Sequence, residues 1–321
     1  MKKNIGKISK KIKLLVIGDL MLDEYLYGNV ERVSPEAPVP IVRLEKKIYS
    51  LGGAGNVSNN ISSLGAKASL ISIVGNDENS KKIEFLLKKK NINKFFVFKS
   101  NKFKTIVKSR ILSQGQQVLR LDNENDIFFN ISQKNNIFNN LKKKIKNFDC
   151  VIVSDYGKGV CDLELVRNII DLSNKLNIPV FADPRKKNKD FNIYRNSFCI
   201  TPNMNELNSV YKNVGNNSKE VLKCSLDIKK RYNIKNVLVT RGEKGISLLD
   251  DKNKFHIYKS MAKEVYDVSG AGDTVISTLA TLYCTKMDFK FAAKISNLAA
   301  SIAVSHRGTY QISKKELIKI I

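Results

Sequence analysis

The sequence predicts an α/β fold in which helices cover both faces of a mostly parallel central sheet. Short apolar runs rich in β-branched residues alternate with amphipathic segments over nearly the whole chain, as is typical of buried parallel strands joined by helices. In chain order, the predicted strands are residues 14–17, 69–74, 150–153, 179–182, 198–200 and 237–239. The predicted helices between them are residues 56–64, 163–176, 203–211 and 221–232.

Two regions interrupt this alternation and predict a small β lid. One is rich in proline and alternates apolar with polar side chains, and the other also contains many strand-forming residues. Because neither contains a long helix, we place the lid at about residues 24–50 and 95–122. We expect this lid to lie beside the main sheet of a single domain that spans residues 1–321.

The composition is typical of a protein that works in water inside the cell. The chain has 321 residues, of which 42% are hydrophobic, and no apolar run approaches the ~18–20 residues that span a membrane. The five cysteines are scattered and lack a metal-binding spacing, which indicates a reducing compartment. We therefore expect a cytoplasmic protein with no membrane partner.

The formal charge of +26 raises the hypothesis of nucleic-acid binding. The excess is mostly lysine, and the lysines are spread along the chain together with many Asn and Ile residues, all encoded by A/T-rich codons. No zinc-finger, helix-turn-helix or aromatic RNA-binding pattern accompanies them. We interpret most of this charge as solvated surface and expect no specific nucleic-acid partner.

The segment 267–274 predicts an anion-binding turn followed by a helix. From residue 274 onward, apolar side chains recur at helical spacing. The backbone amides of Gly270, Ala271 and Gly272 would then lie at a helix N-terminus, where unpaired N–H groups attract anions. Asp273 beside them suits the deprotonation of a hydroxyl that attacks a phosphoryl group. The alternative is a glycine-rich turn in which Asp273 only supports the first helical turn.

Polar residues follow five of the predicted strands in succession. In open α/β sheets, ligands bind at the carboxyl ends of the strands. Each such residue alone could be a turn or a helix cap, but the series favours a ligand site. The candidates at or just after these strand ends are Asp19, Asp23, Asp155, Lys158, Asp183, Asn203, Thr240 and Gly242.

Two further segments have both a structural and a functional interpretation. Asn203 and Glu206 have the spacing of a capping box, but they could also serve a nucleotide and Mg²⁺, and both roles could hold at once. Gly53 would let the backbone approach a ligand closely, and Asn56 could bind a sugar hydroxyl. Neither the dinucleotide glycine spacing nor a Walker loop is present, so ATP would be bound without one.

Together these segments resemble the ribokinase (phosphofructokinase-B) family of carbohydrate kinases. Residues 52–58, followed by Gly65 and Gly75, match the first family motif, and residues 267–280 match the second. Thr278 stands where the family usually has Ala or Gly, which we expect to affect helix packing more than chemistry. The resemblance covers the chain from about Lys13 onward and implies a three-layer ribokinase-like fold with a β lid.

The resemblance also implies roles for the candidate residues. Asp273 would be the catalytic base, and the amides of Gly270, Ala271 and Gly272 would stabilise the transferring phosphoryl group. ATP and Mg²⁺ would be bound by Asn203, Met204, Asn205, Glu206, Thr240 and Gly242, with Glu206 reaching the metal through water. The sugar would be bound by Asp19, Asp23, Gly53, Asn56 and Asp155. Candidates for binding a substrate phosphate are Lys108, Arg110, Arg120 and Lys158.

Within the family, the sequence is similar to kinases that phosphorylate D-glycero-β-D-manno-heptose 7-phosphate at its 1-hydroxyl in ADP-heptose and lipopolysaccharide core synthesis. Residues 18–23, 32–40, 116–122 and 154–159 carry this similarity. It implies a homodimer formed through the lid and a possible need for a monovalent cation. Because no adenylyltransferase motif is found, we expect that domain to be absent and the activity to come from a separate polypeptide.

Three alternatives stay open at this point. The nearest is a kinase of the same family that acts on another sugar or sugar phosphate. A second is a non-catalytic sugar- or nucleotide-binding protein of the same fold, although the intact segments 203–206 and 270–273 speak against it. The third is a nucleic-acid-binding protein, which a clustered basic face would support.

Overall fold

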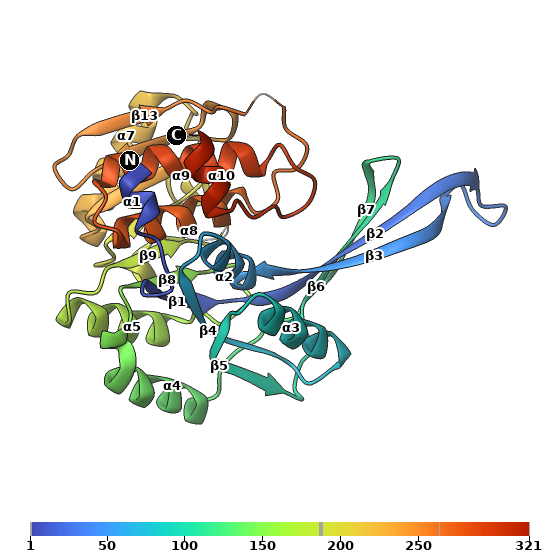
Figure 1. Cartoon of the computed structure of the whole chain (residues 1–321), viewed down its shortest axis with the longest axis horizontal. Coiled ribbons are helices and arrows are strands. Elements are labelled where there is room, and N and C mark those ends of the chain that lie inside the picture. Colours follow the sequence, from blue (N-terminus) through green and yellow to red (C-terminus); the bar gives the residue numbers. More distant parts are fainter. Residues whose placement is uncertain (1, 186–188, 263, 321) are drawn as a thin grey trace.

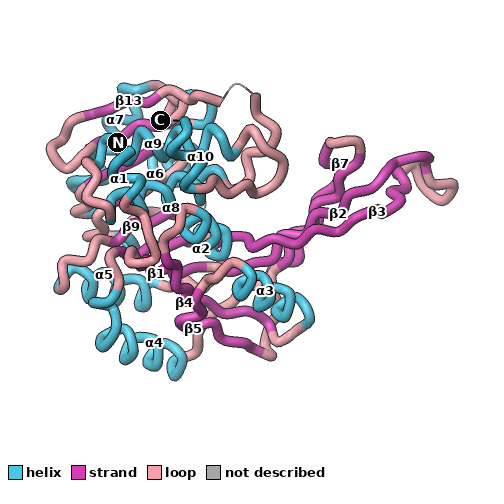
Figure 2. Tube along the Cα trace, in the orientation of Figure 1, coloured by secondary structure: helices cyan, strands magenta, loops and turns pink. Residues whose placement is uncertain are grey.

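Two β-sheets divide the chain into a main body and a projecting lid (Figures 1 and 2). A computed structural model describes residues 2–185, 189–262 and 264–320. Within these ranges the main sheet has nine strands. From one edge to the other they are β13 (Phe255–Tyr258), β12 (Ile246–Leu249), β11 (Asn236–Thr240), β10 (Cys199–Ile200), β9 (Val180–Asp183), β8 (Cys150–Ser154), β1 (Lys13–Gly18), β4 (Lys67–Gly75) and β5 (Asn93–Ser100).

The strands from β11 to β5 all run parallel to their neighbours, whereas β12 and β13 are added antiparallel at one edge. All six strands predicted for the sheet are present, as β1, β4, β8, β9, β10 and β11. The interior strand β1 is buried at every position after its first residue. The predicted α/β class with a mostly parallel sheet is therefore confirmed.

Side chains of β1 alternate between two hydrophobic cores, one on each face of the sheet. Leu14 and Val16 belong to the core that contains residues of α2, α8 and α9, and Leu15 and Ile17 belong to the core of α4, α5 and α7. The helices are α1 (Lys2–Gly6), α2 (Ala54–Ser63), α3 (Glu78–Lys89), α4 (Ile131–Lys144), α5 (Leu163–Lys175), α6 (Met204–Tyr211), α7 (Ser218–Tyr232), α8 (Ala271–Cys284), α9 (Phe289–Ala303) and α10 (Lys314–Ile320). Among the described residues, we find no helix with the length and apolarity to cross a membrane.

The lid is a separate four-stranded sheet within the described ranges, and it extends away from the body (Figure 2). Its strands in spatial order are β3 (Pro40–Gly53), β2 (Leu20–Val33), β6 (Val107–Ser113) and β7 (Gln116–Asn123). Since β2 starts two residues after β1 ends, the lid is attached directly to an interior strand of the main sheet.

The predicted lid boundary at residue 95 is corrected by the structure. Residues 93–100 form β5 and pair in parallel with β4 in the main sheet. Phe95, Phe96 and Phe98 pack against the core on the α4 face, and this burial holds the segment in the body. The second part of the lid therefore begins at Val107.

Helix α8 follows the predicted anion-binding turn and runs through the core. Every residue from Asp273 to Leu282 is buried. Its Thr278 is 0% exposed, and the hydroxyl has no hydrogen-bond partner within the described part of the chain. A buried hydroxyl without a partner costs free energy, so this departure from the family pattern weakens the core without touching the site.

We predict that Thr278→Val raises the free energy of unfolding by about 1–2 kcal/mol, because the unpaired hydroxyl is replaced by a methyl group of similar size. Thermal and denaturant unfolding would measure the change. Thr285→Val is the matched control, since that hydroxyl donates to the Leu282 carbonyl at 2.6 Å and its loss should destabilise the chain. Destabilisation by both substitutions would show that the Thr278 hydroxyl is paired.

Candidate active site

A cavity of about 500 Å³ lies where the carboxyl ends of the main strands meet the base of the lid. Polar and charged groups dominate its wall. Its lining residues are Met21, Asp23, Gly53, Lys108, Arg110, Arg120, Asp122, Glu124, Asp155, Tyr156, Lys158, Asp183, Pro184, Thr201, Asn203, Glu206, Thr240, Val268, Ser269, Gly270, Ala271, Gly272, Asp273 and Thr309. Most of the residues predicted from the strand ends and from the two glycine-rich segments therefore meet in one place.

Asp273 lies in the first turn of α8 and is only 3% exposed. One carboxylate oxygen accepts a hydrogen bond from Asn56 Nδ2 and the other accepts one from the Tyr156 hydroxyl, both at 2.7 Å. Burial raises the pKa of Asp273 to about 6, although these two hydrogen bonds lower it. At mildly acidic pH, Asp273 is therefore about half protonated. The two hydrogen bonds hold its carboxylate in a fixed orientation.

The turn before α8 presents backbone to the cavity. Gly270 has a φ of 80°, and a Cβ there would lie 2.6 Å from Asn56 Nδ2, so glycine is required both by conformation and by space. Gly272 lies beside Asp183, whose Oδ2 would be 3.9 Å from an added Cβ. With Ala271, these residues place helix N-terminal amides at the cavity wall, which favours an anion.

Asp19, whose predicted contact with the sugar stays a prediction, binds the protein backbone. It is fully buried, lies behind the cavity wall, and accepts hydrogen bonds from the backbone N–H groups of Tyr156, Lys158 and Val160 at 2.9, 3.1 and 3.0 Å. Burial raises its pKa to about 6, against the effect of these three bonds. Asp19 therefore holds the loop that carries Tyr156 and Lys158 into the cavity.

Asn56 also lies behind the wall, because its amide nitrogen is used to bind Asp273. Its side-chain oxygen accepts a hydrogen bond from Gln311 Nε2 at 3.1 Å. The contact that the structure gives Asn56 orients the Asp273 carboxylate, and its predicted contact with the sugar stays a prediction. Gly53 and Asp155 line the cavity, and their predicted contacts with the substrate stay predictions too.

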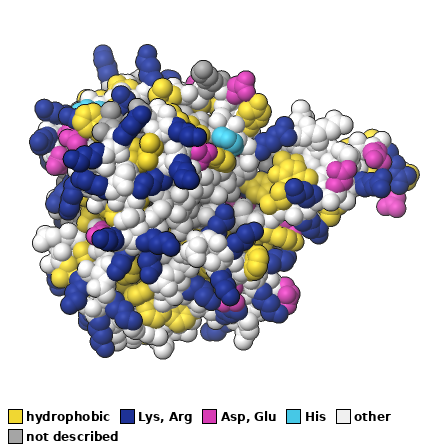
Figure 3. Space-filling view, in the orientation of Figure 1, with side chains coloured by type: hydrophobic (Ala, Val, Ile, Leu, Met, Phe, Trp, Pro, Cys, Tyr) yellow, Lys and Arg dark blue, Asp and Glu magenta, His cyan; other side chains and the backbone are white. Residues whose placement is uncertain are grey.

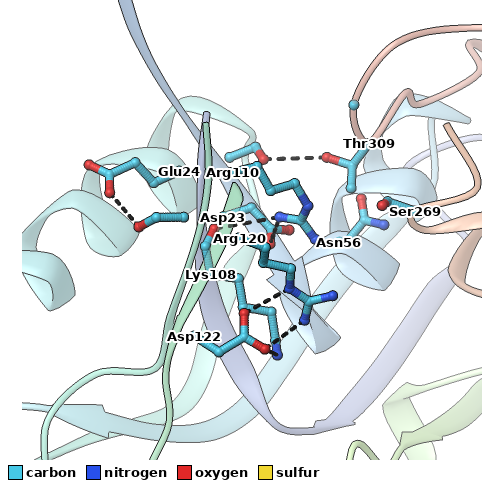
Figure 4. A network of polar contacts seen from close by, with 12 residues as sticks. Asp23, Glu24, Asn56, Lys108, Arg110, Arg120, Asp122, Ser269 and Thr309 are labelled. Carbon is cyan, nitrogen blue, oxygen red and sulfur yellow. Dashed lines mark hydrogen bonds and ion pairs between the residues drawn. The ribbon is translucent and has the colours of Figure 1, made fainter. Parts of the chain in front are cut away.

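An ion pair lies at the base of the lid, where Arg110 Nη1 donates to Asp23 Oδ1 at 2.8 Å (Figure 4). Both side chains are more than 90% buried. Burial raises the pKa of Asp23 although the Arg110 charge opposes this. The guanidinium of Arg110 also lies 5.3 Å from the centre of the Tyr25 ring. Arg110 is therefore committed to the wall of the site and to the Asp23 carboxylate.

The other three candidate phosphate ligands meet on two carboxylates that the sequence analysis did not single out. Arg120 donates to both oxygens of Asp122 at 2.7 and 2.8 Å, and Lys108 Nζ lies 3.4 Å from Asp122 and 2.5 Å from Glu124. Glu124 also pairs with Lys158. Figure 4 shows Lys108, Arg120 and Asp122 gathered on neighbouring lid strands. All five residues line the cavity.

Asn203 and Glu206 form the predicted capping box at the start of α6. The Asn203 side chain accepts from the Glu206 N–H at 2.9 Å, and Glu206 accepts from the Asn203 N–H at 2.7 Å and from its Nδ2 at 2.6 Å. Both residues line the cavity together with Thr240, whose strand forms a bridge to Asn203. The predicted capping box is therefore confirmed. Because Asn203 and Glu206 also line the cavity, their predicted role in nucleotide binding stays open.

Three other residues assigned to the nucleotide lie away from the lining. The side chain of Met204 packs against the hydrophobic core, while Asn205 and Gly242 are exposed outside the cavity. For Met204 and Asn205 the physical reason is helical geometry, since successive residues of α6 point in different directions and the N-cap Asn203 and Glu206 face the cavity. Gly242 lies in the turn after β11, beyond Thr240, which does line the cavity.

Asp183 adds a carboxylate close to this end of the cavity. Its Oδ1 accepts from the Thr201 hydroxyl at 2.8 Å. Burial raises its pKa well above the usual range, and the negative charges of Glu206 and Asp273 raise it further. Among the described residues, no group of three or more His, Cys, Asp or Glu side chains is arranged to bind a metal ion directly.

Sequence reasoning missed Tyr156, Asp122 and Glu124 as side chains of the site, and it named Asp183 as a strand-end candidate without a function. Tyr156 and Asp183 both follow predicted strands, so the strand-end rule pointed to their position but not to a role. Asp122 and Glu124 belong to an exposed lid strand and its end, where no local pattern indicates which way a carboxylate points.

Comparison with known proteins agrees with this geometry. The model of a family described as "pfkB family carbohydrate kinase" matches residues 11–316. The chain belongs to the pfkB family of carbohydrate kinases. As a member, it is a sugar kinase, and the family implies ATP and usually Mg²⁺ as cofactors.

Curated relatives of this pfkB kinase carry the name "Bifunctional protein HldE". The one from Campylobacter curvus is 37% identical over 314 residues, covering 98% of this chain and 66% of that protein. The one from Haemophilus influenzae strain PittEE is 42% identical over 308 residues, covering 96% of this chain and 63% of that protein. This chain thus spans less than two thirds of their length. Because these relatives are named bifunctional, they do not support the expected separate adenylyltransferase.

Solved structures show that the pfkB kinase has the ribokinase-like fold. Phosphofructokinase-2 from Escherichia coli, in complex with substrates and products, has a TM-score of 0.77 and 19% identity, with 96% and 97% of the two chains covered. The ribokinase of Arabidopsis thaliana complexed with ribose and ATP has a TM-score of 0.73 and 19% identity, with 96% and 98% covered. At this identity the likeness concerns the fold alone.

We predict that Asp273→Asn gains stability relative to the unchanged chain as the pH rises from about 4 to 6, by on the order of 3 kcal/mol. In this window the folded chain holds a proton on Asp273 that the unfolded chain has released, so the unchanged chain loses stability as the pH rises. Thermal unfolding from pH 4 to 8 would measure the difference, which should level off above pH 7. A difference independent of pH would contradict the raised pKa of Asp273.

Proposed function

We propose that this kinase transfers the γ-phosphoryl group of ATP to the 1-hydroxyl of D-glycero-β-D-manno-heptose 7-phosphate, giving heptose 1,7-bisphosphate. The observation that carries the proposal is a single cavity with the Asp273 carboxylate at the body end and the cations of the lid base in its wall. That arrangement suits a sugar that is deprotonated at one end and already phosphorylated at the other. The similarity of residues 116–122 and 154–159 to heptose 7-phosphate kinases supports this substrate.

In the proposed reaction, Asp273 takes the proton of the sugar's 1-hydroxyl while the oxygen of that hydroxyl attacks the γ-phosphorus of ATP. The bond between the γ-phosphorus and the β–γ bridging oxygen breaks, and ADP leaves. The amides of Gly270, Ala271 and Gly272 lie at the N-terminus of α8 and stabilise negative charge on the transferring group. Hydrogen bonds from Asn56 and Tyr156 hold the base in place.

The nucleotide end of the cavity would bind ATP through Asn203 and Thr240, next to Asp183 and Glu206. The mutual repulsion of Asp183, Glu206 and Asp273 favours a cation between them and the phosphates of ATP. Both oxygens of Glu206 bind Asn203, so a contact of Glu206 with Mg²⁺ through water fits better than direct coordination. When bound, Mg²⁺ would neutralise charge on the phosphates of ATP.

Two further properties belong to the same proposal. The lid exposes apolar side chains, among them Val33, Val39 and Leu121, which suits a homodimer formed through the lid. A requirement for a monovalent cation would be tested by comparing potassium with sodium in the kinase assay.

The main alternative is a kinase for another sugar or sugar phosphate. Preference for an unphosphorylated sugar in a substrate panel with isotope-labelled ATP would favour it. Absence of ATP turnover with every sugar would favour a non-catalytic sugar- or nucleotide-binding protein. A nucleic-acid partner has less support, because the lysine and arginine side chains are scattered over the face shown in Figure 3.

We predict that Asp273→Asn keeps the fold and lowers kcat on heptose 7-phosphate by about 10²–10⁴-fold, the usual loss for a general base. A coupled kinase assay would measure kcat, and NMR would locate the new phosphate at C1. Circular dichroism and nucleotide binding would serve as folding controls. Near-normal turnover would disprove the role of Asp273, and phosphate at another position would disprove the proposed reaction.

Tyr156→Phe is expected to move the acid limb of the kcat/KM profile to higher pH. The phenol hydrogen bond lowers the pKa of Asp273, so its loss raises that pKa and makes the base available only at higher pH. The measurement is kcat/KM from pH 5 to 9. Tyr211→Phe is the matched control, because its hydroxyl binds Asp227 at 2.8 Å outside the cavity. An unmoved acid limb in Tyr156→Phe would contradict this role.

A further inference from the structure

Asp122 and Glu124 have no part in the proposed reaction, yet they bind three of the four cations assigned to the substrate phosphate. Surface ion pairs of this kind contribute little to stability. The side chains of Asp122 and Glu124 are 34% and 31% exposed, so packing does not explain their position. Their position inside the substrate cavity therefore calls for a functional explanation.

The charges of this cluster are almost balanced. Partial burial opposes ionisation, but the cations lower the pKa of both carboxyls, so Asp122 and Glu124 are negatively charged at neutral pH. Lys108 and Lys158 are 11% and 21% exposed, which means that their ammonium groups are partly removed from water and need an anion nearby. The two carboxylates supply that anion.

The same groups match a phosphate monoester. A phosphate carries a charge of about −1.5 to −2 at neutral pH and offers three acceptor oxygens. The guanidinium fork of Arg120 suits phosphate as well as the carboxylate of Asp122 that it binds now. The lysine ammonium groups bind either anion without strict geometry.

We propose that Asp122 and Glu124 are internal substitutes for the phosphate of the substrate and that this phosphate displaces them from Lys108, Arg120 and Lys158 when it binds. The inference rests on the proposed function, because it requires a substrate that is already phosphorylated. Phosphate binding is then an exchange of one anion for another, so the net gain in binding free energy is small. Only a phosphate attached to a sugar that makes its own contacts binds well, and free phosphate is rejected.

Glu124 also connects the two parts of the molecule. It pairs with Lys108 on strand β6 of the lid and with Lys158 in the loop after β8 of the body. Displacement of Glu124 by the phosphate releases this link and lets the phosphate itself bridge lid and body. The charge of the substrate and the position of the lid are therefore coupled through the side chain of Glu124.

The test is the binding of inorganic phosphate to the full-length chain and to the variants Asp122→Asn and Glu124→Gln. We expect phosphate to bind each variant about tenfold more tightly than it binds the unchanged chain, because a competing anion has been removed. Titration calorimetry would give the affinity, and phosphate inhibition of ATP turnover would provide a second readout. Both substitutions keep side-chain size and lie on a partly exposed surface, which favours normal folding.

Glu84→Gln is the matched control. Glu84 binds Lys94 at 3.1 Å and Lys99 at 3.0 Å, and its side chain is 34% exposed, but it lies outside the substrate cavity. Its loss should leave phosphate affinity unchanged. Unchanged or weaker phosphate binding in Asp122→Asn and Glu124→Gln would overturn the proposal, because the carboxylates would then support the cations instead of competing for them.

This experiment also separates the inference from the proposed function. Tighter phosphate binding by the variants without turnover of heptose 7-phosphate would keep Asp122 and Glu124 as phosphate substitutes for another sugar phosphate. If the chain turns over heptose 7-phosphate but the variants bind phosphate no more tightly, the role of Asp122 and Glu124 as phosphate substitutes is rejected. Heptose 7-phosphate then remains the proposed substrate.

Discussion

The carboxylate of Asp19 holds the loop on which both ends of the site depend. It directly follows β1, an interior strand of the main sheet, and accepts hydrogen bonds from three backbone N–H groups of residues 156–160. That loop brings the Tyr156 hydroxyl to Asp273 and the Lys158 ammonium to Glu124. Because Asp19 is fully buried and follows a buried strand, these hydrogen bonds hold the loop without help from a ligand.

Charge is divided between the two parts of the molecule. The body end of the cavity contains Asp155, Asp183 and Asp273, and burial raises the pKa of all three. The lid base contributes Lys108 and Arg120. The buried carboxylates cost stability and are retained where chemistry requires a base and a cation-binding region. The proposed reaction would use this division, with Asp273 at the body end and the substrate phosphate at the lid base, where Asp122 and Glu124 now almost balance the cations.

The sequence was most informative where backbone geometry determines chemistry. Gly270 and Gly53 are glycines because of positive φ values and close contacts, so their motifs indicate the turn and the helix N-terminus directly. Strand ends located most polar groups because parallel strands place their carboxyl ends together. The predicted sugar contacts of Asp19 and Asn56 stay predictions, because the contacts that the structure gives them are to the protein itself, and residue type does not reveal whether a polar group faces ligand or protein. Sequence reasoning missed Glu124, whose partners are distant in sequence.

These limits have a common origin in how the fold is used. The solved kinases that share this fold are 18–20% identical to the chain and show the fold alone, whereas the family model over residues 11–316 shows the family. Strand β7 of the lid is exposed along its whole length, so no burial pattern indicates which way its charged side chains point. Asp122 and Glu124 illustrate this, since both contact the cations that are proposed to distinguish a sugar phosphate from a sugar. Family membership therefore shows a sugar kinase, whereas the role of Asp273 and the choice of substrate stay proposals that the ion pairs of the lid help to test.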